Sequence, residues 1–299
     1  MKKRLHLLSK QALVWCLFLI SGVMWGQTWN YDFGTTIGTF NSTTASTSFL
    51  PTPTSGTARV RCGTNPGSFV LANPGLSAIG TGNELQFTSN TGSTSTSKFS
   101  IYDYVASKQG YVKFKIVMNG GTNGIYYFTL GDGANFSDNV AIGNTQVFAG
   151  LKFSLGASNA VGYEVLNNTT YGTTGITTPS TLFSQSTSNL YEVEVFYNNE
   201  TTSKNYTRSG ISNSIAASKW DLWVNGTLVG DDLSKGALGA NANIDSFAFN
   251  HQSSATAPGT IYLDDIVYSN ALPLNNAPTV SNVSISGLPN TTVQLTGTY

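Results

Sequence analysis

The chain has little of what most enzymes and nucleic-acid-binding proteins use. Its 299 residues include only two histidines and two cysteines, and 10% of them are charged. A single histidine, His251, and a single cysteine, Cys62, follow the first 26 residues. This count excludes a zinc site with several histidines and a disulfide within the remaining chain. Any Ser-His-Asp or Cys-His arrangement would have to use His251.

Residues 1–26 are predicted to be a signal peptide. They combine a basic start with an apolar stretch over 12–20 that is too short for a comfortable membrane span. A membrane anchor is the alternative interpretation. Cleavage before Gln27 removes four basic and no acidic residues from 15 of each, which leaves 11 against 15 and a net charge of −4. We therefore expect no nucleic-acid partner and no membrane span after signal removal.

Export without a disulfide is more typical of a bacterium than of a eukaryote. We therefore expect an extracellular or cell-surface protein of a Gram-negative bacterium. Aromatic residues make up 12% of the chain, which is too many for a disordered protein. Together with many Gly, Ser, Thr and Asn residues, this composition favours an all-β extracellular module.

Apolar and polar residues alternate repeatedly along the chain, and no helical stripe follows residue 27. The alternation predicts strands at 83–89, 97–105, 111–119, 124–132, 146–156, 160–167, 190–198, 219–225, 244–252 and 259–269. Asn225-Gly226, between two apolar runs, predicts a tight two-residue hairpin, because both positions of that turn need positive φ. About a dozen short strands at hairpin spacing predict a two-sheet antiparallel β-sandwich, a jelly roll.

Three stretches carry a family resemblance: WNYDF at 29–33, WDLWVNGTLV at 220–229 and IYLDDIVYS at 261–269. Over about residues 28–270 the chain resembles the concanavalin A-like (LamG-like) jelly-roll modules of bacterial surface proteins. The resemblance implies a jelly roll, glycan binding or adhesion, and often a structural calcium ion.

The expected domains are the signal peptide at 1–26, the sandwich at 27–270 and a Pro- and Asn-rich linker at 271–278. Residues 279–299 are similar to the first strands of an Ig-like or fibronectin-type module. About 21 residues can form one β-hairpin, which is marginal alone, so we expect this segment to be a truncated start of an Ig-like module. Further domains of the same chain are then expected partners.

The last strand contains two adjacent aspartates, Asp264 and Asp265. Side chains alternate faces along a strand, so one carboxylate, that of Asp265 in a regular strand, is aimed at the apolar face. Such a buried charge is costly unless it is paired or bound to a metal. If the first and last strands pair, Asp32 lies beside these residues, and a shared Ca²⁺ is predicted. The alternative is a bulge that lets both carboxylates reach water.

A second calcium candidate is the loop 131–139, which offers Asp132, Asn135 and Asp138. It has glycine and oxygen ligands but lacks the ligand order and closing glutamate of an EF-hand. An ordinary turn-rich loop is the alternative, because Asp, Gly and Asn dominate turns.

Candidate catalytic residues are few. Glu192 and Glu194 share one strand face, at a spacing compatible with glycosidase carboxylate pairs. A solvated polar face is the alternative for this pair, and a hydrogen-bonded, partly buried histidine is the alternative for His251. The third acid of laminarinase-type jelly rolls is missing after Glu194.

Sugar binding needs fewer groups: an aromatic ring and a few polar side chains. Trp223 and Asp221 share the strand face opposite the expected core and form a candidate platform for a sugar. The alternative is a tryptophan covered by other parts of the protein. The favoured function is a secreted, non-catalytic carbohydrate-binding or adhesion module of a larger surface protein. A polysaccharide hydrolase or lyase on the same fold and a structural spacer are the alternatives.

Overall fold

The computed structural model describes residues 26–64, 67–73, 79–80, 82–91, 96–251 and 256–274. The signal peptide predicted before Gln27 and the hairpin predicted at 279–299 therefore lie outside the described residues. Within the described part there are 19 strands, and the helical elements are two short 3₁₀ turns, η1 (Ala134–Phe136) and η2 (Asn144–Gln146). No helix in this part is long and apolar enough to cross a membrane.

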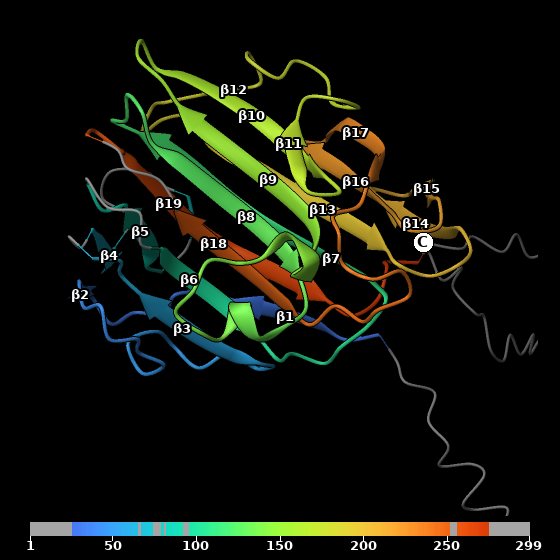
Figure 1. Cartoon of the computed structure of the whole chain (residues 1–299), viewed down its shortest axis with the longest axis horizontal. Coiled ribbons are helices and arrows are strands. Elements are labelled where there is room, and N and C mark those ends of the chain that lie inside the picture. The colour runs from blue at the N-terminus through green and yellow to red at the C-terminus, as the bar shows by residue number, and fades with distance from the viewer. Residues whose placement is uncertain are drawn as a thin grey trace, which may run out of the picture.

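The strands form two large antiparallel sheets that face each other (Figure 1). Sheet A runs in the order β17 (Thr227–Ser234), β16 (Lys219–Val224), β13 (Tyr191–Asn198), β7 (Gln109–Asn119), β19 (Thr260–Ser269), β5 (Glu84–Thr88), β4 (Ser68–Ala72) and β2 (Gly38–Phe40), with β1 (Thr28–Tyr31) also paired to β19. Sheet B runs in the order β11 (Thr170–Gly172), β10 (Ala160–Asn167), β9 (Val147–Leu155), β8 (Ile125–Gly131), β18 (Ser246–His251), β6 (Ser97–Tyr102) and β3 (Thr57–Arg61), with β12 (Phe183–Ser184) paired to β10.

The alternation of side chains places the core between the sheets. In β7, Phe114 is fully buried, whereas the neighbouring Lys113 and Lys115 point away from the core. The Phe114 ring lies 4.9 Å from the rings of Phe128 on β8 and Phe249 on β18, so the two inner faces interdigitate. The predicted all-β, two-sheet antiparallel sandwich is thus confirmed. All ten predicted strands form, with ends shifted by at most three residues.

The remaining strands, β14 (Lys204–Arg208) and β15 (Ile211–Ile215), form a separate two-stranded ribbon, called here the covering hairpin. Its Tyr206 ring stacks on Phe196 of β13 at 4.4 Å, on the outer face of sheet A. The predicted turn between β16 and β17 is also present, since Asn225 and Gly226 have φ values of 47° and 81°. The sequence pattern did not predict the covering hairpin.

Strand β19 changes partners halfway along its length. Its first half pairs with β5 and its second half with β1, as expected if the first and last strands are neighbours. On β7, the partner of Asp264 is Lys115 but the partner of Val267 is Lys113, which defines a β-bulge at Asp265 and Ile266. Asp265 takes up the bulge with a φ of 47°.

The bulge of the alternative interpretation is present, but it lets only Asp265 reach water, so the expected orientation of the two aspartates is corrected. After the bulge it is Ile266 that enters the core, while Asp265 turns outward and stays half-buried. Asp264 instead becomes the fully buried carboxylate. It lies on the outer side of sheet A, on the same side as Tyr262, which packs against Ile79.

Candidate functional site

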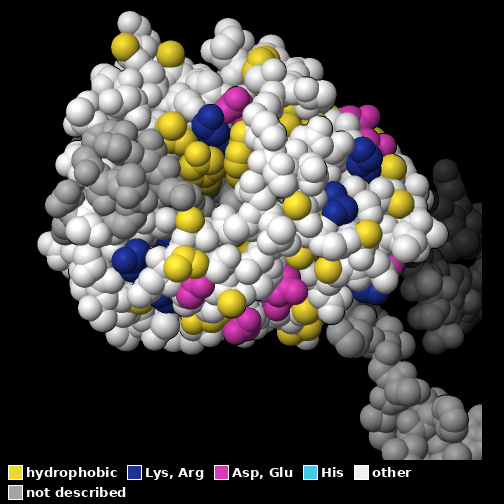
Figure 2. Space-filling model, viewed as in Figure 1, with side chains coloured by type: hydrophobic (Ala, Val, Ile, Leu, Met, Phe, Trp, Pro, Cys, Tyr) yellow, Lys and Arg dark blue, Asp and Glu magenta, His cyan; other side chains and the backbone are white. Residues whose placement is uncertain are grey.

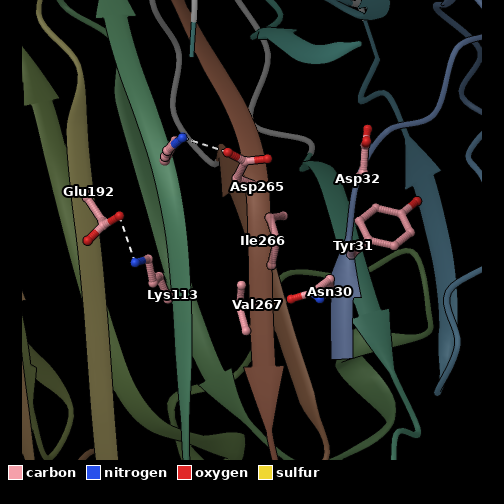
Figure 3. Close-up of a pocket in the computed structure, with 9 residues that line it drawn as sticks. Asn30, Tyr31, Asp32, Lys113, Glu192, Asp265, Ile266 and Val267 are labelled. Carbon is pink, nitrogen blue, oxygen red and sulfur yellow. Dashed lines mark hydrogen bonds and ion pairs between the residues drawn. The ribbon is translucent and has the colours of Figure 1, made fainter. Parts of the chain in front are cut away.

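Polar side chains from four strands meet in a hollow on the outer face of sheet A (Figure 3). The hollow has a volume of about 310 Å³ and is called here the sheet A hollow. Its walls come from β1, β7, β13 and β19, and its lining residues are Asn30, Tyr31, Asp32, Lys113, Lys115, Glu192, Asp265, Ile266 and Val267. Three of the residues singled out from the sequence, Asp32, Glu192 and Asp265, therefore come together here.

The two candidate catalytic glutamates share a face as predicted, but each is held by a cation. Glu192 Oε2 lies 2.7 Å from Lys113 Nζ, and Figure 3 shows the two side chains facing each other. Glu194 is buried and accepts three hydrogen bonds from Arg208, the shortest of which is 2.5 Å. Both carboxylates are therefore engaged by cations of the protein itself, and neither is a free partner for a glycosidic bond.

His251 lies in the core between the sheets, which corrects the expectation of a partly exposed residue. It is fully buried beside the Tyr126 ring, 5.4 Å away, and neither ring nitrogen has a hydrogen-bond partner. Burial lowers the pKa of this imidazole to about 4. A substrate cannot reach a side chain in this position, so the structure removes His251 as a catalytic candidate.

Trp223 and Asp221 do point to the same face, but the covering hairpin lies over them. The Trp223 indole donates a hydrogen bond of 2.8 Å to the Tyr206 hydroxyl, which in turn donates one of 2.8 Å to Asp221. Arg208 lies 4.6 Å above the indole ring. Asp221 is 1% exposed, and burial raises its pKa to about 6. The predicted sugar platform is therefore a packed layer.

The buried Asp264 has the features of a cation ligand. Its Oδ1 accepts the backbone N–H of Asp265 at 2.8 Å, whereas its Oδ2 has no hydrogen-bond partner. Burial raises its pKa to about 7, and the charges of Asp265 and Asp32 act in the same direction. A Cβ atom at Gly80 would lie 1.7 Å from this Oδ2, and one at Gly82 would lie 2.9 Å from Asp32 Oδ1.

A side chain at either glycine would meet a carboxylate, so Gly80 lies directly on Asp264 and Gly82 lies directly on Asp32. An unpartnered buried carboxylate oxygen near a second acid suits a hard, oxygen-seeking cation such as Ca²⁺. Asp265 does not share this role, because its Oδ2 lies 2.6 Å from Lys115 Nζ. The chemistry of the predicted calcium site thus fits Asp264 and Asp32 and leaves Asp265 to an ion pair.

A different group of acids has the tightest clustering in the described part of the chain. The ligand atoms of Asp221, Asp231 and Asp232 all lie within 4.8 Å of one another. However, both oxygens of Asp221 already accept hydrogen bonds, one from Tyr206 and one from the backbone of Asp232. Asp221, the buried member of this group, is therefore satisfied by the protein itself, and Asp231 and Asp232 are exposed.

The second calcium candidate, the loop 131–139, is held by side-chain cations. Asn135 donates from its amide to Asp138 Oδ2 at 2.9 Å, and Asp132 lies at the start of the loop. Lys98 is 1% exposed and donates to the carbonyl of Asn135, and Arg59 donates to that of Asp138 at 2.7 Å. These cations give the loop the charge neutralisation that a bound Ca²⁺ would provide, so the loop does not need a metal to close.

The outer face of sheet B carries a polar row that the sequence pattern did not reveal. Lys98, Asn250, Tyr127, Lys152 and Glu164 lie opposite one another on five neighbouring strands. Each residue is an outward position of its own strand, and that alternation was visible in the sequence. The row itself depends on the pairing of β18 with β6 and β8, which are distant in the chain, and no local pattern predicts that pairing.

No family model and no curated protein matches this chain. Among solved structures, the chain is similar to a carbohydrate esterase of the Shiga toxin-encoding bacteriophage phi24B, with 10% identity, a TM-score of 0.45, and 72% of this chain and 90% of that chain covered. It is also similar to the carbohydrate-binding module CBM66 of Bacillus subtilis, with 10% identity, a TM-score of 0.36, and 71% of this chain and 95% of that chain covered. Peanut lectin matches with 12% identity, a TM-score of 0.41, and 81% of this chain and 97% of that chain covered. Likenesses this distant carry no argument for function.

Proposed function

We propose that this chain is a non-catalytic carbohydrate-binding module that is exported to the cell surface. The observation that carries the proposal is the sheet A hollow, where hydrogen-bond donors and acceptors from four strands converge. The donors are the Asn30 amide and the ammonium groups of Lys113 and Lys115. The acceptors are the carboxylates of Glu192 and Asp265, together with Asp32.

This mixture suits a ligand with many hydroxyl groups, because each hydroxyl both donates and accepts a hydrogen bond. Lys113 and Glu192 form an ion pair, yet their side chains are 32% and 31% exposed, so a ligand can reach both. The ion pair fixes the two side chains before binding, which lowers the entropy lost when a sugar docks. Strands hold five of these six groups in position, and the sixth, Asp32, directly follows β1.

In this proposal a Ca²⁺ ion held by Asp264 and Asp32 has a structural role. When bound, it would neutralise the two acids that lie against Gly80 and Gly82 and connect Asp32 to β19. The sheet A hollow is lined by Asp32 and by Asp265, the neighbour of Asp264, so the ion would also stabilise one wall of the hollow.

The cellular setting is the remaining part of the proposal. The basic start and apolar stretch of residues 1–26 support export, with cleavage before Gln27. The Pro- and Asn-rich segment 271–278 and the strand-like pattern of 279–299 support an Ig-like module after the sandwich. The module would then present its outer faces to extracellular polysaccharides as part of a larger surface protein.

The proposal is tested by incubating the secreted chain with a panel of immobilised polysaccharides and glycans. We expect saturable binding to at least one of them, and we expect Lys113→Ala/Glu192→Ala to weaken it at least about tenfold, because both polar partners are lost. Glu200→Ala/Lys204→Ala, at half-exposed positions beside and within the covering hairpin, makes the same change of composition outside the hollow and should bind as the wild type does. Absence of binding to the whole panel would refute the proposal.

A further inference from the structure

A second hollow lies on the outer face of sheet B and is called here the sheet B hollow. It has a volume of about 140 Å³, and its floor is formed by Tyr127 and Thr129 of β8 and by Asn250 of β18. Tyr171 of β11 and Asn144 of the 132–146 loop form its walls. On this face Figure 2 shows a depression with side chains of the hydrophobic class, which includes tyrosine, beside one basic and one acidic group.

Two tyrosine rings provide the apolar part of this hollow. The rings of Tyr127 and Tyr171 lie 5.2 Å apart at an angle of 60°. The Tyr171 hydroxyl lies over Gly150, where a Cβ atom would come within 2.8 Å of it. Burial raises the pKa of both tyrosines, so both remain neutral and present ring faces with a hydroxyl at the edge.

The buried amide of Asn250 is the observation that points most directly to a ligand. Asn250 is 4% exposed, and its Oδ1 atom has no hydrogen-bond partner. Its strand places it between Lys98 of β6 and Tyr127 of β8, on the floor of the hollow. An unpaired buried acceptor is rare in native proteins and marks the position of a missing donor. An ordered water, or an O–H or N–H group of a ligand in the hollow, can supply that donor.

A charge pair stands next to the rings. Lys152 Nζ lies 2.5 Å from Glu164 Oε2, and Lys152 is the cross-strand neighbour of Tyr127. The two side chains are partly exposed, at 24% and 30%, and both keep the capacity for further hydrogen bonds. Hydroxyl groups at the edge of a ring stacked on Tyr127 would meet this pair.

The wall of the hollow is fixed before any ligand binds. Lys98 donates to the carbonyl of Val140 at 3.1 Å, and Arg61 donates to that of Asn139 at 3.2 Å. Asn144 itself donates to the carbonyl of Thr169 at 2.8 Å, which ties the 132–146 loop to the turn before β11. In Figure 1 this loop, with its 3₁₀ turns, crosses in front of the strands of sheet B. A preformed wall lowers the entropic cost of binding.

We infer that the sheet B hollow is a second carbohydrate subsite, which takes a single sugar ring. The apolar C–H face of the ring lies against Tyr127 and Tyr171, and a hydroxyl or acetamido N–H group donates to Asn250 Oδ1. A volume of about 140 Å³ is below that of pockets for drug-sized ligands, which favours one ring at a chain end over an extended polymer. This inference rests on the proposed function and adds a second ligand site to it.

The test is a titration of the full chain with glucose, galactose and N-acetylglucosamine, followed by NMR of the asparagine side-chain amides and by calorimetry. We expect at least one sugar to shift the Asn250 amide signals. Asn250→Leu should weaken the binding of that sugar at least about tenfold, since it removes the acceptor that the ligand needs. Its melting temperature should stay equal or rise, because an unpaired buried polar atom is replaced by an apolar group.

Two further variants separate this site from the sheet A hollow. Tyr127→Ala removes the stacking surface at a half-exposed position and should also weaken the binding of the sugar about tenfold. Asn30→Leu makes the same substitution as Asn250→Leu but in the sheet A hollow, and should leave the Asn250 shifts intact.

The outcomes distinguish the two claims. If a sugar binds and only Lys113→Ala/Glu192→Ala weakens it, the sheet B subsite is refuted while the proposed function stands. If sugars leave the Asn250 signals unchanged and polysaccharides still bind, the hollow holds ordered water only, and the inference fails. If no carbohydrate binds at all, both claims fail together.

Discussion

Lys113 and Lys115 on the outer face of sheet A and Lys98 on the outer face of sheet B are used in opposite ways. On sheet A, Lys113 and Lys115 pair with carboxylates while their side chains remain about one quarter to one third exposed. On sheet B, Lys98 is fully covered, and backbone carbonyls of the 132–146 loop take the place of a full ion pair. The lysines on sheet A can exchange partners with a ligand, whereas Lys98 builds the wall against which a ligand would rest.

The difference shows how burial decides the role of a residue type. A half-exposed ion pair contributes little to stability, because water competes for both charges. A buried ammonium loses its hydration and depends on every hydrogen bond that replaces it, and burial lowers the pKa of Lys98 to about 8. We therefore expect the same substitution to have very different effects on the two faces.

The largest expected effect is that of Lys98→Met. It leaves the carbonyls of Asn135 and Val140 without their donor and Asp138 without its nearby charge, and should lower the free energy of unfolding by about 3 kcal/mol. The matched change on sheet A, Lys113→Met, should cost less than about 1 kcal/mol. Urea denaturation of both variants measures the difference, and equal losses would contradict the contrast between the faces.

The core shared by both faces gives a pH-dependent prediction. His251 has its pKa lowered to about 4, so between pH 6.5 and 4 the unfolded chain binds more protons than the folded one. Stability contributed by the neutral imidazole is therefore present above pH 6.5 and is lost as the pH falls, by up to about 3 kcal/mol.

The effect is isolated by comparing the wild type with His251→Leu over this pH range. Asp221 and Asp245, whose pKa values are raised to about 6, titrate in both proteins and cancel in the difference. As the pH falls, the wild type should lose more unfolding free energy than His251→Leu does. If the difference in unfolding free energy between the two proteins does not change with pH, His251 reaches water in the folded state.

The next largest expected effect is that of Ca²⁺ on thermal stability. This effect should depend on Asp264 and not on its neighbour Asp265. Addition of Ca²⁺ should raise the melting temperature of the wild type and EDTA should reverse the rise. At 100 times the dissociation constant, the stabilisation is about 2.7 kcal/mol. Asp264→Asn should abolish the response, because it alters the buried oxygen ligand.

Asp265→Asn is the control for this measurement. It removes the ion pair with Lys115 but not the proposed ligand, so it should keep most of the calcium response. A wild type that melts identically in Ca²⁺ and EDTA would refute the metal site, and an equal loss in both variants would refute the assignment to Asp264.

The smallest effect should come from the ion pairs at the rims of the two hollows. Double-mutant cycles on Lys113 with Glu192, and on Lys152 with Glu164, should each give about 0.2–1 kcal/mol. Both values should fall in 1 M salt, because the partners are exposed. A coupling above about 2 kcal/mol on one face would mean that its pair is more desolvated than its exposure indicates.

The sequence predicted the features of the fold that depend on local pattern. Period-two alternation located the strand 111–119 and its outward lysines, and Asn225-Gly226 located the hairpin turn, because both follow from neighbouring residues. It also identified Asp264 and Asp265 as a conflict in β19. Which of the two would be buried depended on a bulge, and that in turn depended on the exchange of β5 for β1 beside the strand.

The candidate site was harder to predict, because it depends on contacts between distant segments. Alternation correctly placed Trp223 and Asp221 on the outer face, but the covering hairpin just before β16 folds back over them, and no local signal showed that fold-back. The outward position of Asn250 was equally visible. Its place beside Tyr127 arises only when β18 inserts between β6 and β8, which no local signal specifies.

The most direct test of the central claim is the binding of the chain to the polysaccharide of the panel that it binds most strongly. The wild type should bind it saturably, and Lys113→Ala/Glu192→Ala combined with Asn250→Leu should abolish binding while circular dichroism and the melting profile still show a folded sandwich. Retained binding by this folded combined variant, or no binding by the wild type, would contradict the assignment of carbohydrate recognition to the two outer faces.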